Sequence, residues 1–518
     1  MSSKNSPGVH VATIAVGANI GDRFANIELA LRLLEGPQFI EGVDSPYVHV
    51  VDTSFMYETE PMYETDQPMF INCCCLIHTN IEPVMLLRFL KHLESTVGRV
   101  VSYRNGPRAI DLDILTYDDL TVDTRGVDNR KTLDNLEGQL VVPHPRLYER
   151  EFVLRPLNDI IPDYTHPTLK RSVNGLFTSL IATAPPTATY WKFPVAGSPL
   201  PTPRKTYIMG TLNMTPDSFS DGSVNNTLSA ALEYAATSIA AGADILDVGG
   251  YSTRPGAAFV STEEETTRVV PVVRALRDVA ETRDVLLSVD TFRPEVAAAA
   301  VRAGANCVND VHALSGPTFP PDATSAAHSA AMRAVLRDLA VPVVLMHSRG
   351  EASANKDYTA YDYAADARGR GAVLEAVRVE LGRKVDAAVR GRGGLRRWLV
   401  IIDPGIGFSK TLEGNLEVLR GSSSTVDPIA TVGKERAPNP LAGYPTLIGA
   451  SRKSFLGTIL AQPDASNTYK GRETKPVERK FATSAAVACA VQQGATIVRV
   501  HDVIEMGDVV RVTSLLWG

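Results

Sequence analysis

The sequence has few cysteines, and their spacing argues against two common ways of stabilising a small domain. Only five occur among 518 residues, and no two are separated by the two residues typical of zinc-binding pairs. Three are consecutive and the others lie in apolar stretches: Cys73, Cys74, Cys75, Cys307 and Cys489. We therefore expect neither a zinc site nor a disulfide framework, and a protein of a reducing compartment.

Long apolar runs and an excess of basic charge are also missing. No stretch reaches the roughly 18–20 apolar residues that a membrane-spanning helix needs. The net charge is −6, so there is no general basic field to attract nucleic acid or a membrane. The first ten residues resemble neither a secretory signal nor an Arg-rich presequence. We expect a cytoplasmic or mitochondrial protein with no nucleic-acid or membrane partner. Its abrupt start, with a strand-like run by Val9, is consistent with a removed upstream part.

The length predicts more than one domain, because 518 residues exceed what a single core usually supports. Hydrophobic residues make up 44% and charged residues 21%, which is ordinary for a globular protein. The stretch 183–204 is dense in Pro, Ala, Ser and Thr and lacks periodicity, so we interpret it as a linker. It separates a first domain at 9–182 from a second at 205–518. A cut between Pro194 and Thr202 is predicted to leave two folded, separately active pieces.

Eight short apolar runs predict a parallel barrel in the second domain. They are Tyr207–Leu212, Ile245–Val248, Leu286–Val289, Cys307–Val308, Val343–Met346, Leu399–Ile402, Thr446–Ile448 and Ile497–Val500. Amphipathic helices are predicted at Leu228–Ala241, Glu263–Glu281, Pro294–Ala303, Ala372–Val389 and Glu478–Gln493. Surface insertions are predicted at Pro317–Ser325, Glu351–Asp362 and Gly421–Gly443. Strands alternating with helices in this way are typical of a TIM (β/α)8 barrel, whose active site lies at the carboxyl ends of the strands.

Polar residues follow every one of these eight runs. They are Asn213, Gly249-Gly250, Asp290, Asn309-Asp310, His347, Asp403, Ser451-Arg452-Lys453, and Arg499 with His501. Turns after strands account for two or three such cases but not for eight. His347 by itself fits a structural strand end as well as a functional role. The pattern as a whole predicts an enzyme site at the barrel mouth.

The first domain alternates strands and helices loosely, as in an α+β fold. Strands are predicted at Val11–Val16, Met69–His78 and Ile110–Leu115. Helices are predicted at Phe24–Leu34, with Asp22 as its cap, at Pro83–Val97, and from Phe152–Leu157 onward.

Two carboxylates on one predicted strand are the informative feature of this domain. Side chains alternate along a strand, so Asp111 and Asp113 point to the same face. Carboxylates about 7 Å apart repel unless a cation lies between them, and Mg²⁺ with phosphate would relieve the repulsion. The cations nearby suit a polyphosphate: Arg99, Arg104, Arg108, His144, Arg146 and Arg150. The alternative is a solvated strand face balanced by arginines.

A phosphate-binding P-loop is absent from the sequence. The segment Gly405–Thr411, with Lys410, is superficially similar but has the wrong spacing.

Several longer strings in the first domain resemble hydroxymethyldihydropterin pyrophosphokinase. They are Gly17–Asp22, Asp66–Asn72, Gly106–Asp113 and Val142–Phe152, and the resemblance covers about residues 10–182. It implies an α+β ferredoxin-like fold, ATP as co-substrate, and Mg²⁺ held by Asp111 and Asp113. It further implies Phe70, Asn72 and Phe152 at the pterin, and Arg99, Arg108, His144 and Arg150 at the ATP phosphates. The stretch Arg99–Arg108 is about a residue shorter than in bacterial relatives, which weakens the roles of Arg99 and Arg104.

The second domain carries strings that resemble dihydropteroate synthase over about residues 205–518. They are Met209–Gly222, Asp247–Gly256, Ser288–Thr291, Asp403–Phe408, Gly449–Phe455 and Arg499–Asp502. The resemblance implies a pterin site of Asp290, Asn309, Asp403 and Lys453, and a pyrophosphate site of Asn213, Arg254, Arg499 and His501. Asn213 would also hold magnesium, and Thr253, Pro255, Phe408 and Ser454 would bracket p-aminobenzoate. Tyr251 departs from the pattern, since bacterial relatives usually have Glu there.

The chain as a whole resembles the fused enzymes of eukaryotic folate biosynthesis, without the upstream aldolase module of fungal versions. This implies catalysis of pterin pyrophosphorylation by Asp111, Asp113 and Arg108, then condensation with p-aminobenzoate by Lys453, Arg499 and His501. A homodimer through the barrel is also implied. Two alternatives are a corrinoid-linked pterin methyltransferase and a pterin-binding scaffold with one inactive site. The Ser451–Ser454 string argues against the first, and the intact acidic and basic residues against the second.

Overall fold

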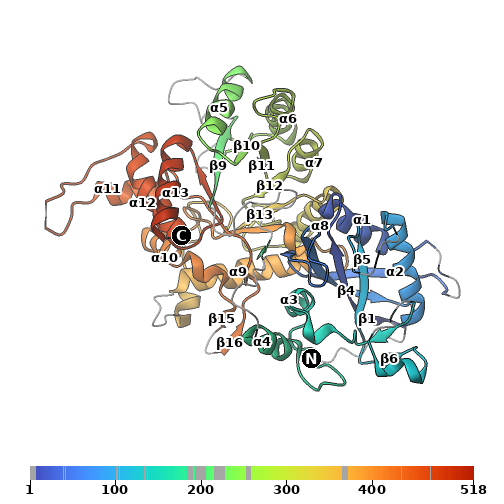
Figure 1. The fold of residues 1–518 in the computed structure, drawn as a ribbon. Coiled ribbons are helices and arrows are strands. Elements are labelled where there is room, and N and C mark those ends of the chain that lie inside the picture. The colour runs from blue at the N-terminus through green and yellow to red at the C-terminus, as the bar shows by residue number, and fades with distance from the viewer. Residues whose placement is uncertain are drawn as a thin grey trace. The chain divides into compact units, whose positions relative to one another are not determined.

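A computed structural model gives the fold. It describes residues 8–517 except 39, 41–42, 101–102, 104, 134–135, 137, 184–190, 193–205, 215–227, 253–257, 365–370, 433–434 and 467. The chain divides into two compact units (Figure 1). Unit 1 comprises Met1–Pro203 with Val389–Trp398, and unit 2 comprises Arg204–Ala388 with Leu399–Gly518. None of the helices in the described ranges is long and apolar enough to cross a membrane.

Unit 1 is built on an antiparallel sheet. Strand β1 (His10–Ala18) lies between β4 (Phe70–Thr79) and β5 (Asp111–Tyr117) and is antiparallel to both. The remaining strands are β2 (Val48–Thr53) and β3 (Tyr57–Thr59), which pair with β4, β8 (Trp191–Lys192), which pairs with β3, and a separate ribbon of β6 (Val122–Asp123) and β7 (Val141–Val142). The predicted α+β class is confirmed, and β8 lies inside the stretch interpreted as a linker.

The helices of unit 1 cover both faces of this sheet. They are α1 (Arg23–Leu34), α2 (Pro83–Val97), α3 (Glu151–Ile160) and α4 (Val173–Thr183). Asp22 caps α1 as predicted, because its side chain accepts a hydrogen bond from the Ala25 amide at 2.9 Å. Helix α2 ends at Gly98, whose φ of +107° favours glycine.

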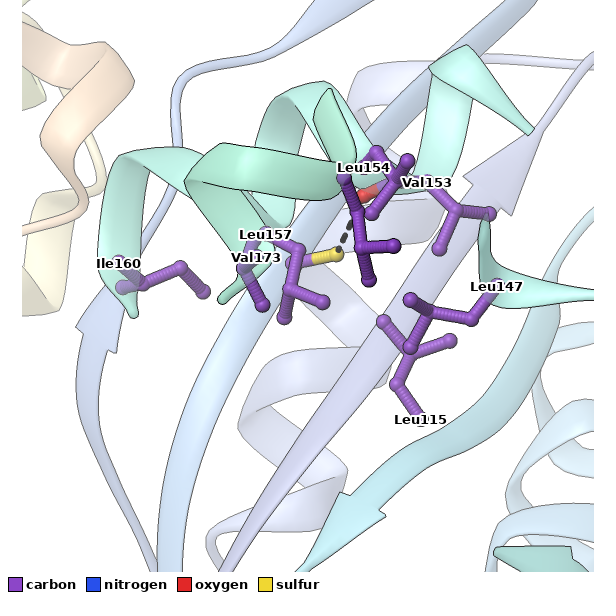
Figure 2. Close-up of a cluster of buried hydrophobic side chains, with 9 residues drawn as sticks. Leu115, Leu147, Val153, Leu154, Leu157, Ile160 and Val173 are labelled. Carbon is purple, nitrogen blue, oxygen red and sulfur yellow. Dashed lines mark hydrogen bonds between the residues drawn. The ribbon is translucent and has the colours of Figure 1, made fainter. Parts of the chain in front are cut away.

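Helices α3 and α4 close one core against the sheet (Figure 2). Cys74 from β4 and Leu115 from β5 belong to this core, together with Leu147, which precedes α3. The helices contribute Val153, Leu154, Leu157, Ile160, Val173 and Leu176. Asp111 and Asp113 lie four and two positions before Leu115 on the same strand, so their side chains are on the same face of the sheet as Leu115, next to the core. This places the acidic pair at the edge of a rigid packed layer.

Unit 1 also contains a segment from far along the chain, which the sequence patterns did not predict. Arg396 Nε lies 3.3 Å from Glu28 Oε2, and Arg396 Nη2 lies 3.1 Å from Glu35 Oε2. Arg397 Nη2 contacts both oxygens of Asp52 at 2.8 and 2.9 Å. A chain cut between residues 194 and 202 would leave these arginines on the second piece. We therefore expect the first piece alone to be less stable than the intact protein.

Replacing Arg397 with Ala should destabilise unit 1 by about 3–5 kcal/mol, because removing one partner of a buried ion pair leaves the other charge uncompensated. Asp52 is only 4% exposed and would lose its bidentate partner. The matched control is Arg130→Ala, which removes a half-exposed arginine of the same unit and should cost at most about 1 kcal/mol. Equilibrium unfolding of both variants in urea, compared with the wild type, measures the two effects. Equal stability of the two variants would contradict the structural role of Val389–Trp398.

Unit 2 is a parallel barrel, as predicted. Its strands are β9 (Tyr207–Asn213), β10 (Ile245–Gly249), β11 (Leu286–Asp290), β12 (Cys307–Asp310), β13 (Val343–Met346), β14 (Val400–Asp403), β17 (Leu447–Ile448) and β18 (Ile497–Val500). The sheet runs β14-β13-β12-β11-β10-β9-β18-β17, and a parallel bridge between Ile402 and Thr446 links its two ends. All eight predicted runs form strands.

The barrel helices lie outside the strands, as α5, α6 and α7 show in Figure 1. They are α5 (Leu228–Ala240), α6 (Thr262–Asp278), α7 (Pro294–Arg302), α8 (Ala323–Leu339), α9 (Ala372–Val389), α10 (Leu412–Arg420), α11 (Ser454–Ala461), α12 (Lys480–Gln492) and α13 (Val503–Trp517). One insertion prediction needs correction, because a helix begins inside the predicted segment. Asp322 and Ser325 form a capping box that starts α8 inside Pro317–Ser325. Gly421–Gly443 contains a hairpin of β15 (Ile429–Val432) and β16 (Glu435–Pro438).

Candidate active sites

The acidic pair of β5 lies among cations, as the sequence predicts. Arg99 Nη1 is 2.7 Å from Asp111 Oδ1, and Arg108 Nη1 is 2.9 Å from Asp111 Oδ2. Lys91 Nζ lies 3.7 Å from Asp113 Oδ1. Burial alone would raise the pKa of Asp113, but Lys91 and the other nearby cations hold that pKa below its ordinary value. The Asp113 carboxylate therefore stays ionised at neutral pH and is available to a metal.

A buried glutamate organises this side of the site. Glu94 Oε1 accepts hydrogen bonds from Lys91 Nζ at 2.7 Å and from the Leu112 amide at 2.8 Å. Its second oxygen lies 2.5 Å from Arg99 Nη1. Burial raises the pKa of Glu94, although the two cations oppose the rise. Glu94 thus ties helix α2 to strand β5 and orients both cations toward the acidic pair.

A narrow pocket of about 110 Å³ opens beside the acidic pair. Phe70, Asn72 and Phe152, the three predicted pterin contacts, all line it. Asn72 Nδ2 donates to Thr59 Oγ1 at 2.7 Å. A Cβ on Gly17 would lie only 2.7 Å from Asn72 Oδ1, so the absence of a side chain there lets the amide reach its position. The pocket has the flat aromatic walls and amide edge that a pterin ring requires.

A larger cleft of about 1010 Å³ adjoins the pocket and shares the acidic pair with it. Arg99, Arg108, His144 and Arg150 all line this cleft, so the structure brings the four predicted phosphate contacts together. The Arg150 guanidinium lies 5.6 Å from the centroid of the Phe152 ring and hydrogen-bonds Tyr63 Oη at 3.1 Å. Burial lowers the pKa of His144, so its imidazole is neutral at pH 7.

The mouth of the barrel holds a buried acid–arginine network. Arg499, on β18, places Nε 2.6 Å from Asp247 Oδ2 and Nη2 2.8 Å from Asp290 Oδ2. Asn309 Nδ2 donates to Asp247 Oδ2 at 3.0 Å. These side chains come from β10, β11, β12 and β18 and meet at the carboxyl ends of the strands.

Burial and neighbouring charges shift the pKa values of the groups in this network in opposite directions. Burial raises the pKa of Asp290 to about 7, and Arg499 only partly offsets the rise. Asp247 and Asp290 in turn hold the pKa of Arg499 above its ordinary value despite its burial. Asp247 Oδ1 is buried and has no hydrogen-bond partner among the described residues. A free acceptor of this kind suits an N–H group of a bound ring.

A second carboxylate–cation group lies at the ends of β14 and β17. Asp403 Oδ1 accepts from the Gly405 amide at 2.7 Å. Lys453 Nζ lies 4.2 Å from the centroid of the Phe408 ring, and a Cβ on Gly407 would meet Lys453 Cδ at 2.8 Å. Burial raises the pKa of Asp403 to about 6, against the lowering effects of the Gly405 amide and of Lys453.

The remaining predicted residues differ in how far the structure describes them. Asn213 ends β9 beside Gly249, and His501 Nδ1 lies 3.0 Å from Ser451 Oγ. Ser454 is the first residue of α11, where backbone amides face outward from the helix start. Thr253, Arg254 and Pro255 lie outside the described residues, as does Arg104. His347 is 2% exposed and hydrogen-bonded on both ring nitrogens, which favours a structural role.

Residues of these sites that were not among the predicted ones include Asp247, Glu94, Lys91 and Tyr63. Asp247 is a charged residue inside the apolar run Ile245–Val248, and this unusual position is a signal in the sequence that could have identified it. Glu94 lies on the buried face of α2 and Tyr63 in a connecting segment, and neither belongs to a local motif. Only the tertiary structure connects them to Arg99 and Arg150.

Comparison with known families agrees with this geometry. The family profile described as "7,8-dihydro-6-hydroxymethylpterin-pyrophosphokinase (HPPK)" matches residues 13–162, and the profile described as "Pterin binding enzyme" matches residues 209–501. The second match alone covers more than half of the chain. The chain belongs to the bifunctional folate synthesis proteins. Its unit 1 contains the pyrophosphokinase domain and its unit 2 the dihydropteroate synthase domain.

Related folate synthesis proteins occur in plants and fungi. The mitochondrial folate synthesis bifunctional protein of Pisum sativum is 37% identical over 97% of this chain and 88% of its own length. The folic acid synthesis protein of Pneumocystis carinii is 35% identical over 100% of this chain, which spans 61% of that protein. The dihydropteroate synthase of Synechocystis is 40% identical over 61% of this chain.

The fold is shared with a solved bifunctional enzyme. A triple mutant of the HPPK-DHPS of Plasmodium falciparum, in complex with pteroate, superposes with a TM-score of 0.73 over 98% of this chain and 95% of that one. The sequence identity is 20%, so the likeness concerns the fold.

Proposed function

We propose that this chain catalyses two consecutive transfers in folate biosynthesis. Unit 1 moves a pyrophosphoryl group from ATP to 6-hydroxymethyl-7,8-dihydropterin and releases AMP. Unit 2 then joins the product to p-aminobenzoate and gives 7,8-dihydropteroate and pyrophosphate. The observation that carries the proposal is that each unit brings together acceptor groups suited to the edge of a pterin ring and cationic side chains suited to phosphate.

In unit 1, the pterin would lie between Phe70 and Phe152 with its polar edge on Asn72. The cleft would take the triphosphate against Arg99, Arg108, His144 and Arg150. Arg99 and Arg108 now bind Asp111, so a phosphate arriving with its own cation could take over both guanidinium groups. Holding hydroxyl and phosphate in one cleft supplies the in-line geometry that such transfers need.

Magnesium fits the donors that unit 1 offers. No group of three or more His, Cys, Asp or Glu side chains that could hold a metal occurs in the described part of the chain. Mg²⁺ is commonly held by one or two carboxylates, with water and phosphate oxygens completing its octahedron. Asp111 and Asp113 are such a pair, and the bound ion would neutralise charge that develops on the phosphate oxygens.

In unit 2, the pterin edge would meet Asp290, Asn309, Asp403 and Lys453, with Asp247 Oδ1 as a further acceptor. Arg499 and His501, with Asn213 and Arg254, would stabilise the departing pyrophosphate, and Asn213 would hold a second Mg²⁺. The amine of p-aminobenzoate would attack the pterin methylene. Thr253, Pro255 and Phe408 would bracket its ring, and the first amides of α11 with Ser454 would take its carboxylate.

We place the pyrophosphokinase domain at 9–182, the linker at 183–204 and the synthase domain at 205–518, with Val389–Trp398 completing unit 1. We infer a cytoplasmic or mitochondrial protein without nucleic-acid or membrane partners. The Pisum sativum relative carries "mitochondrial" in its name.

The decisive experiment supplies ATP, 6-hydroxymethyl-7,8-dihydropterin, p-aminobenzoate and Mg²⁺ to the purified chain. AMP, pyrophosphate and dihydropteroate should all appear. AMP without dihydropteroate would limit the proposal to unit 1. Ligand binding with no turnover would instead favour the scaffold alternative.

We further propose a homodimer through the barrel. Helices α12 and α13 pack together and expose large apolar side chains: Phe481, Ile504, Val512, Leu515, Leu516 and Trp517. Apolar clusters of this kind are typical of protein interfaces.

Replacing Phe481, which is 91% exposed, with Glu should shift the protein from dimer to monomer in sedimentation or light scattering. The matched control is Phe259→Glu, which makes the same substitution at an exposed apolar position before α6. It should leave the molecular mass in solution, and so the dimer, unchanged. A wild-type protein that is monomeric at micromolar concentration would contradict the dimer.

A further inference from the structure

A buried lysine beside the second site has no role in the transfer proposed for unit 2. Lys410 lies between β14 and α10 and is only 4% exposed. Its ammonium donates three hydrogen bonds: to Gly405 O at 2.9 Å, to Phe408 O at 3.1 Å and to His347 Nδ1 at 3.1 Å. An ammonium has three N–H groups, so each one has a partner. A side chain held on all sides in this way is well ordered and suited to organise its surroundings.

Two of these partners are carbonyls of one loop, residues 404–409, which joins Asp403 to Lys410 itself. The loop has an unusual backbone, with left-handed φ values of +72° at Gly405, +82° at Gly407 and +50° at Ser409. A Cβ on Gly405 would meet His347 O at 2.0 Å, so the loop lies against the residue that follows β13. Carbonyl groups of this loop point into the protein, and a buried carbonyl without a hydrogen-bond donor lowers the stability of the folded state. Lys410 is that donor for two of them.

The third partner fixes the ammonium from the opposite side. Burial lowers the pKa of His347 to about 3, with the nearby Lys410 charge adding to the effect, so the imidazole is neutral. Its Nδ1 accepts from Lys410, and Nε2–H donates to Glu380 Oε2 at 3.0 Å. Glu380 is in turn held by Arg349, with Nη2 to Oε1 at 2.6 Å. The chain of contacts anchors Lys410 to helix α9.

The loop that Lys410 holds carries the residues assigned to the pterin site. The Gly405 amide binds Asp403, Gly407 packs on the stem of Lys453, and the Phe408 ring lies under the Lys453 ammonium. A loop displaced by even about 1 Å would disturb all three contacts, and misplacement on that scale can cost about 10²-fold in rate.

We propose that Lys410 is a positioning residue for the synthase reaction, which holds residues 404–409 so that Asp403 and Phe408 are presented to Lys453 and the pterin. The inference rests on the proposed function of unit 2. The partners of Lys410 within unit 2 also explain why the P-loop-like spacing of Gly405–Lys410 has no phosphate role. The three N–H groups point into protein acceptors rather than into a cleft.

The charge of Lys410 gives the proposal a distinctive pH readout. Burial lowers the pKa of Lys410 to about 7, and burial likewise raises the pKa of Asp403 to about 6, with Lys410 among the groups that oppose the rise. The other groups facing Asp403 are the Gly405 amide, Lys453 after β17 and Arg499 on β18, while the neutral His347 adds no charge. Loss of Lys410 should raise the pKa of Asp403 further. The acid limb of kcat/KM should therefore move to higher pH.

The test compares Lys410→Met and Lys410→Gln with Lys384→Met in the full-length protein. Lys384 is a matched control, because it is another buried lysine of the barrel. It donates to His312 O at 3.1 Å and to Ser315 Oγ at 2.9 Å, and it is not among the main groups that shift the pKa of Asp403. Lys410→Gln keeps a donor for one loop carbonyl but removes the charge. This variant should fold more readily than Lys410→Met. It distinguishes the effect of the hydrogen bonds to the loop from the effect of the charge on Asp403.

We expect Lys410→Met to lower kcat/KM for dihydropteroate formation by about 10- to 100-fold, mainly through a raised KM for the pterin pyrophosphate. Calorimetric binding of pteroic acid should weaken in parallel. Lys410→Gln should show a smaller loss but the same movement of the acid limb. Lys384→Met should keep the wild-type limb, and AMP formation by unit 1 should be normal in every variant.

An unchanged KM and an unchanged acid limb in both Lys410 variants would overturn the proposal. So would aggregation of both variants, since Lys410 would then serve folding alone. If the acid limb of kcat/KM moved equally in Lys384→Met, the shift would be a general effect of losing a buried charge, and this outcome would also overturn the proposal. If the wild-type protein makes no dihydropteroate, the function proposed for unit 2 fails instead.

Discussion

Replacing Asp111 with Asn should abolish AMP formation while dihydropteroate synthesis from supplied pyrophosphorylated pterin continues. The amide keeps the shape of the side chain but removes the charge that a cation needs, and Asp113 alone cannot hold the ion against Arg99 and Lys91. Charge stabilisation by a metal is worth several kcal/mol, and each 1.36 kcal/mol is tenfold in rate. We expect a loss of at least about 10³-fold in kcat, measured by release of AMP.

Asp123→Asn is the matched control for this variant. Asp123 also pairs with an arginine of unit 1, Arg125, at 2.9 Å, but it lies on β6 and lines neither the pocket nor the cleft. Its kinase rate should equal that of the wild type. Binding of a non-hydrolysable ATP analogue gives a second readout, because Mg²⁺ should strengthen it in the wild type and not in Asp111→Asn. Near-normal turnover of Asp111→Asn in Mg²⁺ would refute the metal assignment.

Replacing Lys453 with Ala should lower the rate of dihydropteroate formation by at least about 10²-fold, the usual effect of losing one well-placed polar stabiliser. The ammonium lies over the Phe408 ring and is among the groups that oppose the rise in the pKa of Asp403. Its loss should therefore also move the acid limb of kcat/KM above the wild-type position, since Asp403 would take up a proton at higher pH.

The control here is Lys480→Ala, which removes an exposed lysine of the same barrel that pairs with Glu505 at 2.8 Å. It should leave both the rate and the pH profile of the synthase unchanged. AMP formation should be normal in both variants, because unit 1 contains neither lysine. A Lys453→Ala protein that retains full synthase activity would place this lysine outside the pterin site.

The strands of the barrel could be predicted from the sequence with little error. The strands at Val343–Met346 and Ile497–Val500 have their predicted bounds. Strands of a parallel sheet are buried on both faces, so each one appears in the sequence as a continuous run of apolar and β-branched residues. Helix α8 was missed. Its alanine-rich sequence after Asp322 has a weak apolar stripe, and the prolines before it suggested an insertion.

The sequence by itself determined where the barrel strands lie, that polar residues follow them, and that Asp111 and Asp113 share a face. Each of these follows from local periodicity, which the chain encodes over a few neighbouring residues. Only the tertiary structure decided which of the polar residues meet. Arg499 reaches Asp247 across 252 positions of the chain, and Arg397 reaches Asp52 across 345. Such pairs depend on strand register and on the packing of whole elements, which no local pattern contains. The contacts of Lys410 with its three acceptors could not be predicted from the sequence either. The loop that supplies two of them contains left-handed residues and takes its shape from the strands and helix around it.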